Sequence, residues 1–163
     1  MQFTHQHIFA ASLDRVVEML ADEGFAHERA RASGGDDGQV RVDGTADSAF
    51  TVAIRRVVPT TSIPSEFRSF VGKDLHVRYT EAWEPPSGND RIGTFAVEIV
   101  GAPGHVGGAL GLTPSGEGTE FLSTGEVKVS IPLFGSMVEK ALTEAVLKGL
   151  ALELAAADTW LTR

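Results

Sequence analysis

The sequence contains no cysteine among its 163 residues, so disulfide bonds and thiolate metal sites are both excluded. Basic residues are also in the minority, with 14 Lys and Arg against 22 Asp and Glu and a net charge of −8. Because phosphate binding needs a basic surface, and Lys and Arg form no cluster along the chain, we expect no nucleic-acid partner.

Long hydrophobic runs are missing as well. No stretch approaches the roughly 20 apolar residues that a membrane-spanning helix requires, so we expect no stable membrane insertion. The first residues, MQFTHQHIFA, show no basic segment followed by an apolar one, and we therefore expect a cytoplasmic protein. A chain of this length suits one domain over residues 1–163, with a substantial core.

Catalytic and cofactor motifs are absent too. The glycine-rich stretch GAPGHVGGALG contains no P-loop signature and no G-x-G-x-x-G between a strand and a helix. No serine lies in a G-x-S-x-G motif. His5 and His7 share a strand face, as zinc ligands can, but no third ligand is evident. We therefore predict no cofactor, no metal site and no catalytic residue. The glycines between Gly101 and Gly125 favour strands that leave room beneath them.

The apolar pattern that is present indicates an α+β protein. Residues 3–9 alternate as a strand does, and Ser12 suits the N-cap of a short helix over residues 12–22, with a second one possible over 25–32. The pattern then changes to period two, which predicts six further strands joined mostly by short turns. These strands are expected at residues 39–45, 49–58, 75–84, 91–100, 105–112 and 119–130. Short turns favour antiparallel neighbours.

Two longer segments complete the chain. The connector PTTSIPSEFRSFVGKD, residues 59–74, includes Ile63 and Val71 among its apolar residues and is expected to be a packed loop with a helical turn. In the last segment, Ser136 and Glu139 fit the S-x-x-E capping box at the start of a helix that ends near Leu161. At ~1.5 Å per residue, this helix measures about 38 Å and must cross most of the domain.

Three stretches, FAASLDRVVEML, LHVRYTEAW and SIPLFGSMVEKALTEAV, together with this order of elements, resemble the START-like superfamily, also called Bet v 1-like or SRPBCC. The third stretch is similar to an uncharacterised actinobacterial family within it. The resemblance covers the whole chain. It implies a helix-grip fold, in which a curved antiparallel seven-stranded sheet wraps around a long C-terminal helix, with two short helices after the first strand.

The resemblance also implies a cavity beneath the sheet that holds an apolar ligand. Members of the superfamily include lipid carriers, plant hormone receptors, aromatic polyketide cyclases and ATPase activators of chaperones. A shared fold does not choose among these functions.

The inward face of the final helix combines small residues with one charge. At about 100° per residue this face holds Val138, Leu142, Ala145, Gly149, Ala156 and Trp160, with Glu153 close to it. Glycine inside a helix costs about 1 kcal/mol relative to alanine, and space for a ligand is a gain that offsets this cost. The alternative is that a bulky sheet residue, Trp83 or Phe95, fills the gap at Gly149.

Three charged residues are predicted to point inward: Arg56 and Glu81 by strand alternation, and Glu153 by its place on the helix. Arg56 is the basic residue that alternation places there, so we expect it within salt-bridge range of Glu153, directly or through Glu81. Such a group anchors the polar head of a ligand or forms a closed structural network. A third alternative is that the charges lie at the edge of the core and reach solvent.

Taken together, these features predict a protein that binds a hydrophobic or amphipathic small molecule, lipid- or polyketide-like, in an internal cavity. The predicted ligand-binding residues are Arg56, Tyr79, Glu81, Trp83, Phe95, Val97, Leu110, Phe121, Ser123, Val127, Leu142, Ala145, Gly149, Glu153 and Trp160. Two alternatives remain. One is a cyclase or dehydratase in which Glu81 or Glu153, with a raised pKa, acts as general base beside Tyr79. The other is a protein-interaction module with a filled core.

Overall fold

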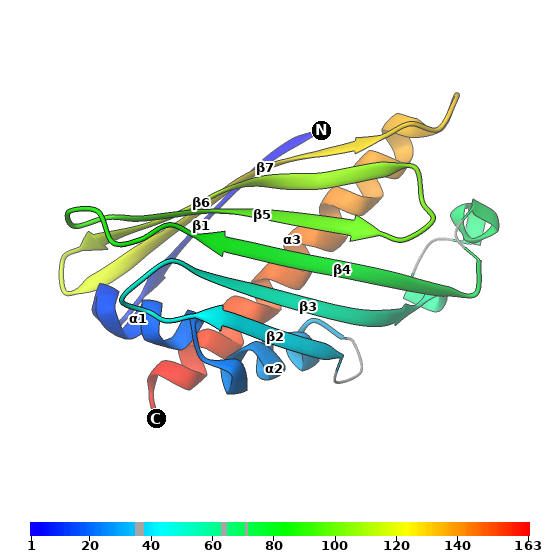
Figure 1. The fold of residues 1–163 in the computed structure, drawn as a ribbon. Coiled ribbons are helices and arrows are strands. Elements are labelled where there is room, and N and C mark those ends of the chain that lie inside the picture. Colours follow the sequence, from blue (N-terminus) through cyan, green and yellow to red (C-terminus); the bar gives the residue numbers. More distant parts are fainter. Residues whose placement is uncertain (35–37, 63–64, 71) are drawn as a thin grey trace.

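The computed structural model describes residues 1–34, 38–62, 65–70 and 72–163 (Figure 1). Its helices and strands follow one another as the periodicity predicts, with two short 3-10 helices, η1 and η2, in the connector. The elements are β1 (Gln2–Phe9), α1 (Leu13–Leu20), α2 (Glu23–Ala32), β2 (Gln39–Gly44), β3 (Phe50–Pro59), η1 (Thr60–Ser62), η2 (Ser65–Phe70), β4 (Asp74–Trp83), β5 (Arg91–Ile99), β6 (Gly104–Ser115), β7 (Gly118–Val129) and α3 (Gly135–Leu161).

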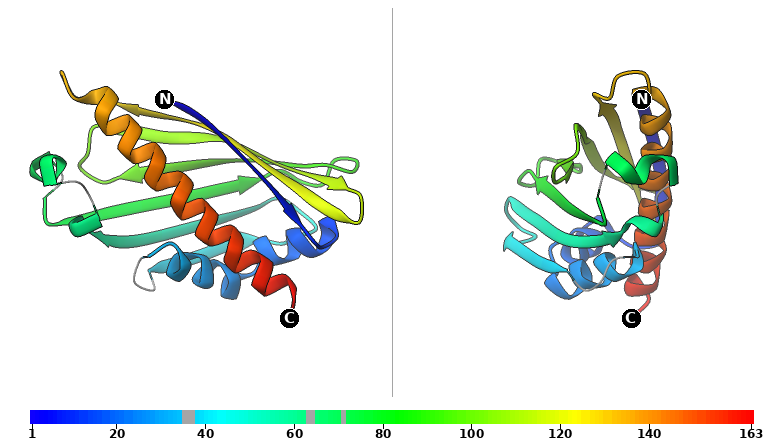
Figure 2. Two further views of the ribbon diagram at one scale, coloured as in Figure 1. Left: turned by 180° about the vertical axis from the view of Figure 1, so that it is seen from behind. Right: turned by 90° about the vertical axis from the view of Figure 1, so that its right-hand side faces the viewer.

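The seven strands form one antiparallel sheet in the order β1-β7-β6-β5-β4-β3-β2. α3 runs diagonally across one face of this sheet, and α1 and α2 lie on the same side, near the C-terminal half of α3 (Figure 2). Seen from the side, the sheet is bent rather than flat, as strand twist requires (Figure 2). The predicted helix-grip architecture is therefore confirmed. None of the described helices is long and apolar enough to cross a membrane.

β6 extends three residues beyond the predicted end at Leu112 and includes Pro114. β5 pairs with β6 only as far as Leu112, so the extension of β6 has β7 as its single neighbour. A strand edge tolerates proline because one side of the strand needs no ladder donor. The turn residues of this segment thus belong partly to a strand that continues past the end of β5.

The capping box predicted for the last helix is wrong. α3 begins at Gly135, and its N-cap, Phe134, makes no side-chain hydrogen bond to the helix. Glu139 does not turn back to Ser136; its Oε1 accepts a hydrogen bond of 3.0 Å from the backbone N–H of Val129. The carboxylate therefore joins the first turns of α3 to the end of β7.

The connector between β3 and β4 contains the helical turns that the sequence predicts, as η1 and η2. Ile63 and Val71, whose packing was expected there, lie outside the described residues.

The interior is filled at the end where β1, α1 and α2 meet the sheet. Its largest fully buried side chains include Phe9, Val16, Phe25, Phe50 and Leu112. Two of the strand glycines, Gly108 and Gly125, serve packing rather than leaving empty room, contrary to expectation. A Cβ atom at Gly125 would lie 2.5 Å from Cζ of Phe3, and one at Gly108 would lie 2.9 Å from Cε1 of Phe95. Aromatic rings therefore occupy the space that these glycines provide.

Candidate functional site

A buried ionic cluster lies between α2, β4 and α3, with Arg29 at its centre. Arg29 Nη2 donates to Glu81 Oε1 at 2.5 Å and to Glu153 Oε2 at 3.1 Å, and Arg29 Nε donates to the same Glu153 oxygen at 3.3 Å. The Tyr79 hydroxyl lies 3.3 Å from Arg29 Nη2. One guanidinium thus compensates two carboxylates from two different elements. We call Arg29, Tyr79, Glu81, Trp83 and Glu153 the ionic cluster.

Each element presents its part of the cluster through its own periodicity. Tyr79, Glu81 and Trp83 alternate along β4 and so point to the same face of the sheet. Arg29 lies one helical turn after Phe25 on the buried face of α2, and its guanidinium carbon lies 5.9 Å from the centre of the Phe25 ring. The same carbon lies 5.4 Å from the centre of the Tyr79 ring, so two aromatic faces flank the cation.

Glu81 is fully engaged. Its Oε1 accepts from Arg29 and from the Tyr79 hydroxyl, and its Oε2 accepts from the Trp83 indole N–H at 3.0 Å. Burial alone would raise the pKa of this carboxyl, but the Arg29 charge and these hydrogen bonds together hold it below its usual value. Glu81 is therefore an ionised structural acceptor. A general base needs a pKa near the working pH, so this environment opposes the catalytic role considered for Glu81.

The same surroundings keep the Tyr79 phenol neutral and the Arg29 guanidinium charged. Burial, and next the negative charge of Glu81, raise the pKa of Tyr79 well above its usual value, so the phenol stays protonated. Burial opposes the charge on Arg29, but Glu81, Tyr79 and Glu153 outweigh it and keep the pKa of Arg29 above its usual value. The cluster is a stable arrangement of charges rather than a proton relay.

Glu153 lies at the boundary of the cluster. Its side chain is 15% exposed, against 3% for Glu81. Both hydrogen bonds from Arg29 reach its Oε2. Oε1 faces a less enclosed environment and accepts no hydrogen bond within the described parts of the chain.

The predicted pairing of Arg56 with Glu153 is wrong. Arg56 does lie on the inward face of β3, half-buried, but its Nη1 donates to the Ser33 hydroxyl at the C-cap of α2. The partner of both carboxylates is Arg29, which the sequence analysis missed. The available signal was the spacing of Phe25, Ala26, Arg29 and Ala30, which marks one buried face of α2. An arginine on such a face needs an acidic partner opposite it.

Beyond the ionic cluster, the inward side chains become progressively more exposed. Along β3, Phe50, Val52 and Ile54 are buried, whereas Arg56 and Val58 are only half-buried. β4 and β5 show the same gradient toward the end of the sheet that adjoins η1 and η2. Leu75, at the start of β4, is buried and is an exception to this gradient. On β6 and β7, Val106 and Val127 are level with Val97 but buried, so solvent reaches the inner face here on β3, β4 and β5.

We call this region the open end. It is defined by the half-buried inward residues Val58, Val77, Val97 and Ile99 of the sheet and Leu142, Val146, Leu147 and Leu150 of α3.

The predicted ligand-binding residues divide into three groups. Six of them belong to the filled core: Trp83, Phe95, Leu110, Phe121, Ser123 and Val127. Six others lie in the ionic cluster or near the open end: Arg56, Tyr79, Glu81, Val97, Leu142 and Glu153. The remaining three are on α3: Ala145 is exposed, Gly149 faces α2, and Trp160 packs against Phe25 with ring centres 5.5 Å apart. The structure thus brings some of them together and separates the rest.

The gap at Gly149 is not filled by Trp83 or Phe95. A Cβ atom there would have a single neighbour within 4 Å outside the helix itself, the Ser33 Cβ at 3.9 Å. The Trp83 ring instead packs on Gly93 in the adjacent strand, where a Cβ would lie 2.9 Å from its Cε3. Space therefore remains beside Gly149, on the side of α2.

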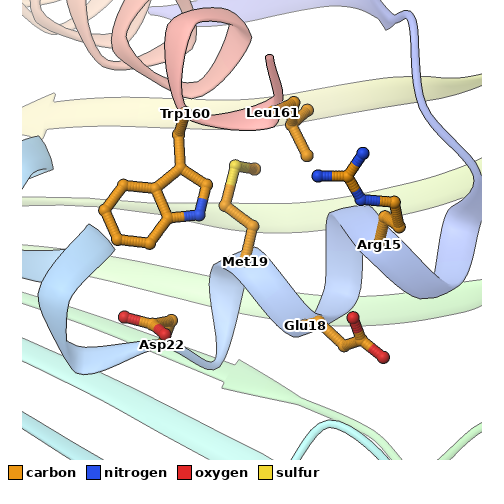
Figure 3. A pocket seen from close by; sticks show the side chains of 6 residues that line it. All are labelled: Arg15, Glu18, Met19, Asp22, Trp160 and Leu161. Carbon is orange, nitrogen blue, oxygen red and sulfur yellow. The ribbon is translucent and has the colours of Figure 1, made fainter. Parts of the chain in front are cut away.

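A separate pocket of about 190 Å³ lies at the surface between α1 and the last turn of α3 (Figure 3). Charged side chains from α1 surround it, and Trp160 and Leu161 cover its other side (Figure 3). Its lining residues are Arg15, Glu18, Met19, Asp22, Trp160 and Leu161. It is smaller than the roughly 300–1,000 Å³ typical of ligand sites and lies outside the space between the sheet and α3, so it is not the expected cavity.

Comparison with solved structures places the fold. A protein of Thermus thermophilus, TTHA0849, superposes with a TM-score of 0.63 at 17% identity, over 99% of this chain and 97% of its own. The ZhuI aromatase/cyclase of Streptomyces sp. R1128 superposes with a TM-score of 0.62 at 16% identity, over 100% of this chain and 94% of its own. Norcoclaurine synthase of Thalictrum flavum superposes with a TM-score of 0.58 at 17% identity, over 100% of this chain and 87% of its own.

At such identities these likenesses show the fold alone, and they confirm that this chain resembles Bet v 1-like, or SRPBCC, proteins in fold. Among curated protein sequences, none matches the chain. A family model does match, over residues 4–161. The chain belongs to this family, which is described as a protein of unknown function (DUF2505).

Proposed function

We propose that the protein binds a hydrophobic or amphipathic small molecule, lipid- or polyketide-like, between the sheet and α3. The observation that carries this proposal is the open end, where inward-facing apolar side chains from two layers stay half-exposed beside a buried ionic cluster. Apolar side chains that face one another across an interior usually exclude water completely. An apolar ligand covers them at a gain of about 25 cal/mol per Å² removed from water.

The ligand would lie along the residues that approach the open end. Val97 and Leu142 supply apolar contacts, Tyr79 supplies a ring, and Glu153 marks the polar limit of the site. The buried residues beyond them, Trp83, Phe95, Leu110, Phe121 and Ser123, form its closed floor in this proposal, and Val127, buried on β7 level with Val97, forms one side. Ala145 and Trp160, which are exposed or turned toward α2, fall outside it.

The protonation and hydrogen bonding of Glu81 favour a ligand-binding protein over the cyclase or dehydratase alternative. The fold relatives include an aromatase/cyclase and a synthase, and they share with this chain its architecture only. A general base requires a carboxylate with a raised pKa and a free lone pair, whereas the pKa of Glu81 is lowered and both of its oxygens accept hydrogen bonds.

Uptake of a neutral apolar fluorophore, N-phenyl-1-naphthylamine, tests the proposal. The protein should enhance its fluorescence saturably. Gly149→Leu, which extends a side chain into the space beside α2, should weaken uptake at least about fivefold, which corresponds to a loss of about 1 kcal/mol of ligand contact. Gly149→Ala is the matched control, because its methyl group makes only an ordinary 3.9 Å contact. Absence of saturable uptake by the unmodified protein would contradict the proposal.

A further inference from the structure

Two buried donors lack an acceptor within the described residues: Nη1 of Arg29 and Nε of Arg56. A buried polar group without a partner costs about as much as its lost solvation, and such groups are rare in folded proteins. Arg29 is only 4% exposed, so bulk solvent does not satisfy it. Both atoms belong to arginines whose side chains lie on the inward side of the molecule.

The two arginines are connected through the C-cap of α2. Arg56 Nη1 donates to the Ser33 hydroxyl, and this hydroxyl donates to the backbone carbonyl of Arg29 at 2.9 Å. On the sheet, Arg56 lies opposite Val77, the next inward residue of β4 before Tyr79. On the helix side, Gly149 faces Ser33 and leaves space there. The two arginines are thus joined through Ser33, beside the space that Gly149 leaves between α2 and α3.

The charges of the cluster decide which acceptor is favoured. Arg29 faces the two carboxylates of Glu81 and Glu153, and with the positive charge of Arg56 these groups sum to zero when both carboxylates are ionised. A ligand carboxylate would leave one uncompensated negative charge in this poorly solvated place, beside two carboxylates that repel it. A carbonyl or hydroxyl oxygen accepts the same hydrogen bonds and adds no charge.

We infer that Arg29 Nη1 and Arg56 Nε bind the uncharged oxygen of an amphipathic ligand, so that the site selects ketones, esters or alcohols over carboxylic acids. This inference rests on the proposed function, whose ligand it specifies. Glu153 adds to the selection, because its partly exposed carboxylate repels an acid and accepts from a hydroxyl group.

Three naphthalenes of one shape test the selection: 2-acetylnaphthalene, 2-ethylnaphthalene and 2-naphthoate, each competing with N-phenyl-1-naphthylamine. The acetyl compound should bind at least about tenfold more tightly than the ethyl compound, as expected for a hydrogen bond to a charged donor. The naphthoate should bind most weakly. The infrared carbonyl band of the bound acetyl compound should shift to lower frequency relative to the same compound in an apolar solvent.

Variants of the two arginines test which donor causes the preference for the acetyl compound. Arg56→Lys keeps the charge but removes the Nε donor. Among the described residues Arg56 belongs to no ion pair, so this variant should fold and lose most of the preference for acetyl over ethyl. Arg29→Lys should lose the rest, and its folding is checked by circular dichroism. Arg55→Lys is the matched control, since Arg55 is the exposed neighbour on the same strand and should leave the preference unchanged.

The possible results separate the two proposals. Equal affinity for the acetyl and ethyl compounds overturns the inference, assigns the two donors to buried water, and leaves the proposed function standing. Tightest binding of the naphthoate overturns it in favour of an anion site. If neither the fluorophore nor any naphthalene binds, the proposed function itself fails.

Discussion

A single arginine makes the interior of this protein compatible with two carboxylates. Without Arg29, Glu81 and Glu153 would face each other's negative charge in a place where Glu81 is only 3% exposed. Replacing one partner of a buried ion pair is costly because the other charge is left without compensation, whereas removing all the charges together often costs little. The cluster therefore behaves as one unit whose members cannot be changed singly.

This dependence predicts a strongly non-additive set of variants. Arg29→Met should lower the free energy of unfolding by about 3–5 kcal/mol, whereas Arg29→Met combined with Glu81→Gln and Glu153→Gln should recover at least about half of that loss. Urea unfolding followed by circular dichroism measures both. Arg55→Met, on the exposed face of β3, serves as control and should change stability by less than about 0.5 kcal/mol. A triple variant as unstable as the sum of its single changes would show that the three residues do not act together.

At the scale of single elements, the strands could be predicted well and the helices only in part. Alternation is a local property of a strand, so it places Glu81 and Arg56 on the inward face correctly. Their partners could not be read in the same way, because the pairing depends on how α2 packs against the sheet. α2 supplies Arg29 to β4, and its C-cap Ser33 accepts from Arg56.

The final helix shows the same limit. Ser136 and Glu139 have the spacing of a capping box, but the end of β7 lies close enough for Val129 to take the carboxylate instead. On α3, the face that packs is marked by Thr143, Leu154, Ala157 and Leu161, which differs from the face that the sequence suggested. A helix that crosses a curved sheet contacts different neighbours along its length, so one straight stripe does not describe it.

The turns at the filled end depend on another arginine, Arg91, at the start of β5. Its guanidinium donates to the backbone carbonyls of Glu84 at 2.6 Å and Ala46 at 2.7 Å, and also to that of Ser48. It thereby joins the β2–β3 turn to the β4–β5 turn. Its guanidinium carbon also lies 5.5 Å from the centre of the Phe50 ring.

We expect Arg91→Met to destabilise the fold by about 3 kcal/mol, because three carbonyls lose a charged donor in a place where Arg91 is only 3% exposed. Hydrogen exchange should rise at both turns together. Arg78→Met is the control, since its contact with Glu98 is between exposed side chains and contributes at most about 1 kcal/mol. A rise in exchange at one turn alone would mean that Arg91 does not couple them.

At the scale of the whole molecule, the interior has two halves with different physical states. Near β1, α1 and α2, aromatic rings and branched side chains fill the space, including the space above strand glycines. Toward the open end, facing residues of β3, β4, β5 and α3 stay half-exposed, whereas Val106 and Val127 on β6 and β7 are buried. The order of elements and the fold followed from the sequence, whereas this division did not, because it depends on which side chains meet across the layers. The ionic cluster lies at the boundary between the two halves.

Substitutions of two valines on the inner face of the sheet test whether the two halves differ. Val52 of β3 is fully buried in the filled half, and Val97 of β5 is half-exposed near the open end. Val52→Ala should cost about 2 kcal/mol of unfolding free energy, since it leaves a cavity in a packed core, and should leave the affinity for N-phenyl-1-naphthylamine unchanged. Val97→Ala should cost less than about 1 kcal/mol but change that affinity severalfold, since it alters the proposed contact surface.

Urea unfolding gives the stability of each variant, and fluorophore titration gives its affinity. We expect Val52→Ala to change mainly the stability and Val97→Ala mainly the affinity. Equal losses of stability, with no change of affinity in either variant, would mean that the interior is packed from end to end. The protein-interaction module with a filled core would then be the better account of this fold, because a core without an accessible half has no place for a ligand of several hundred Å³.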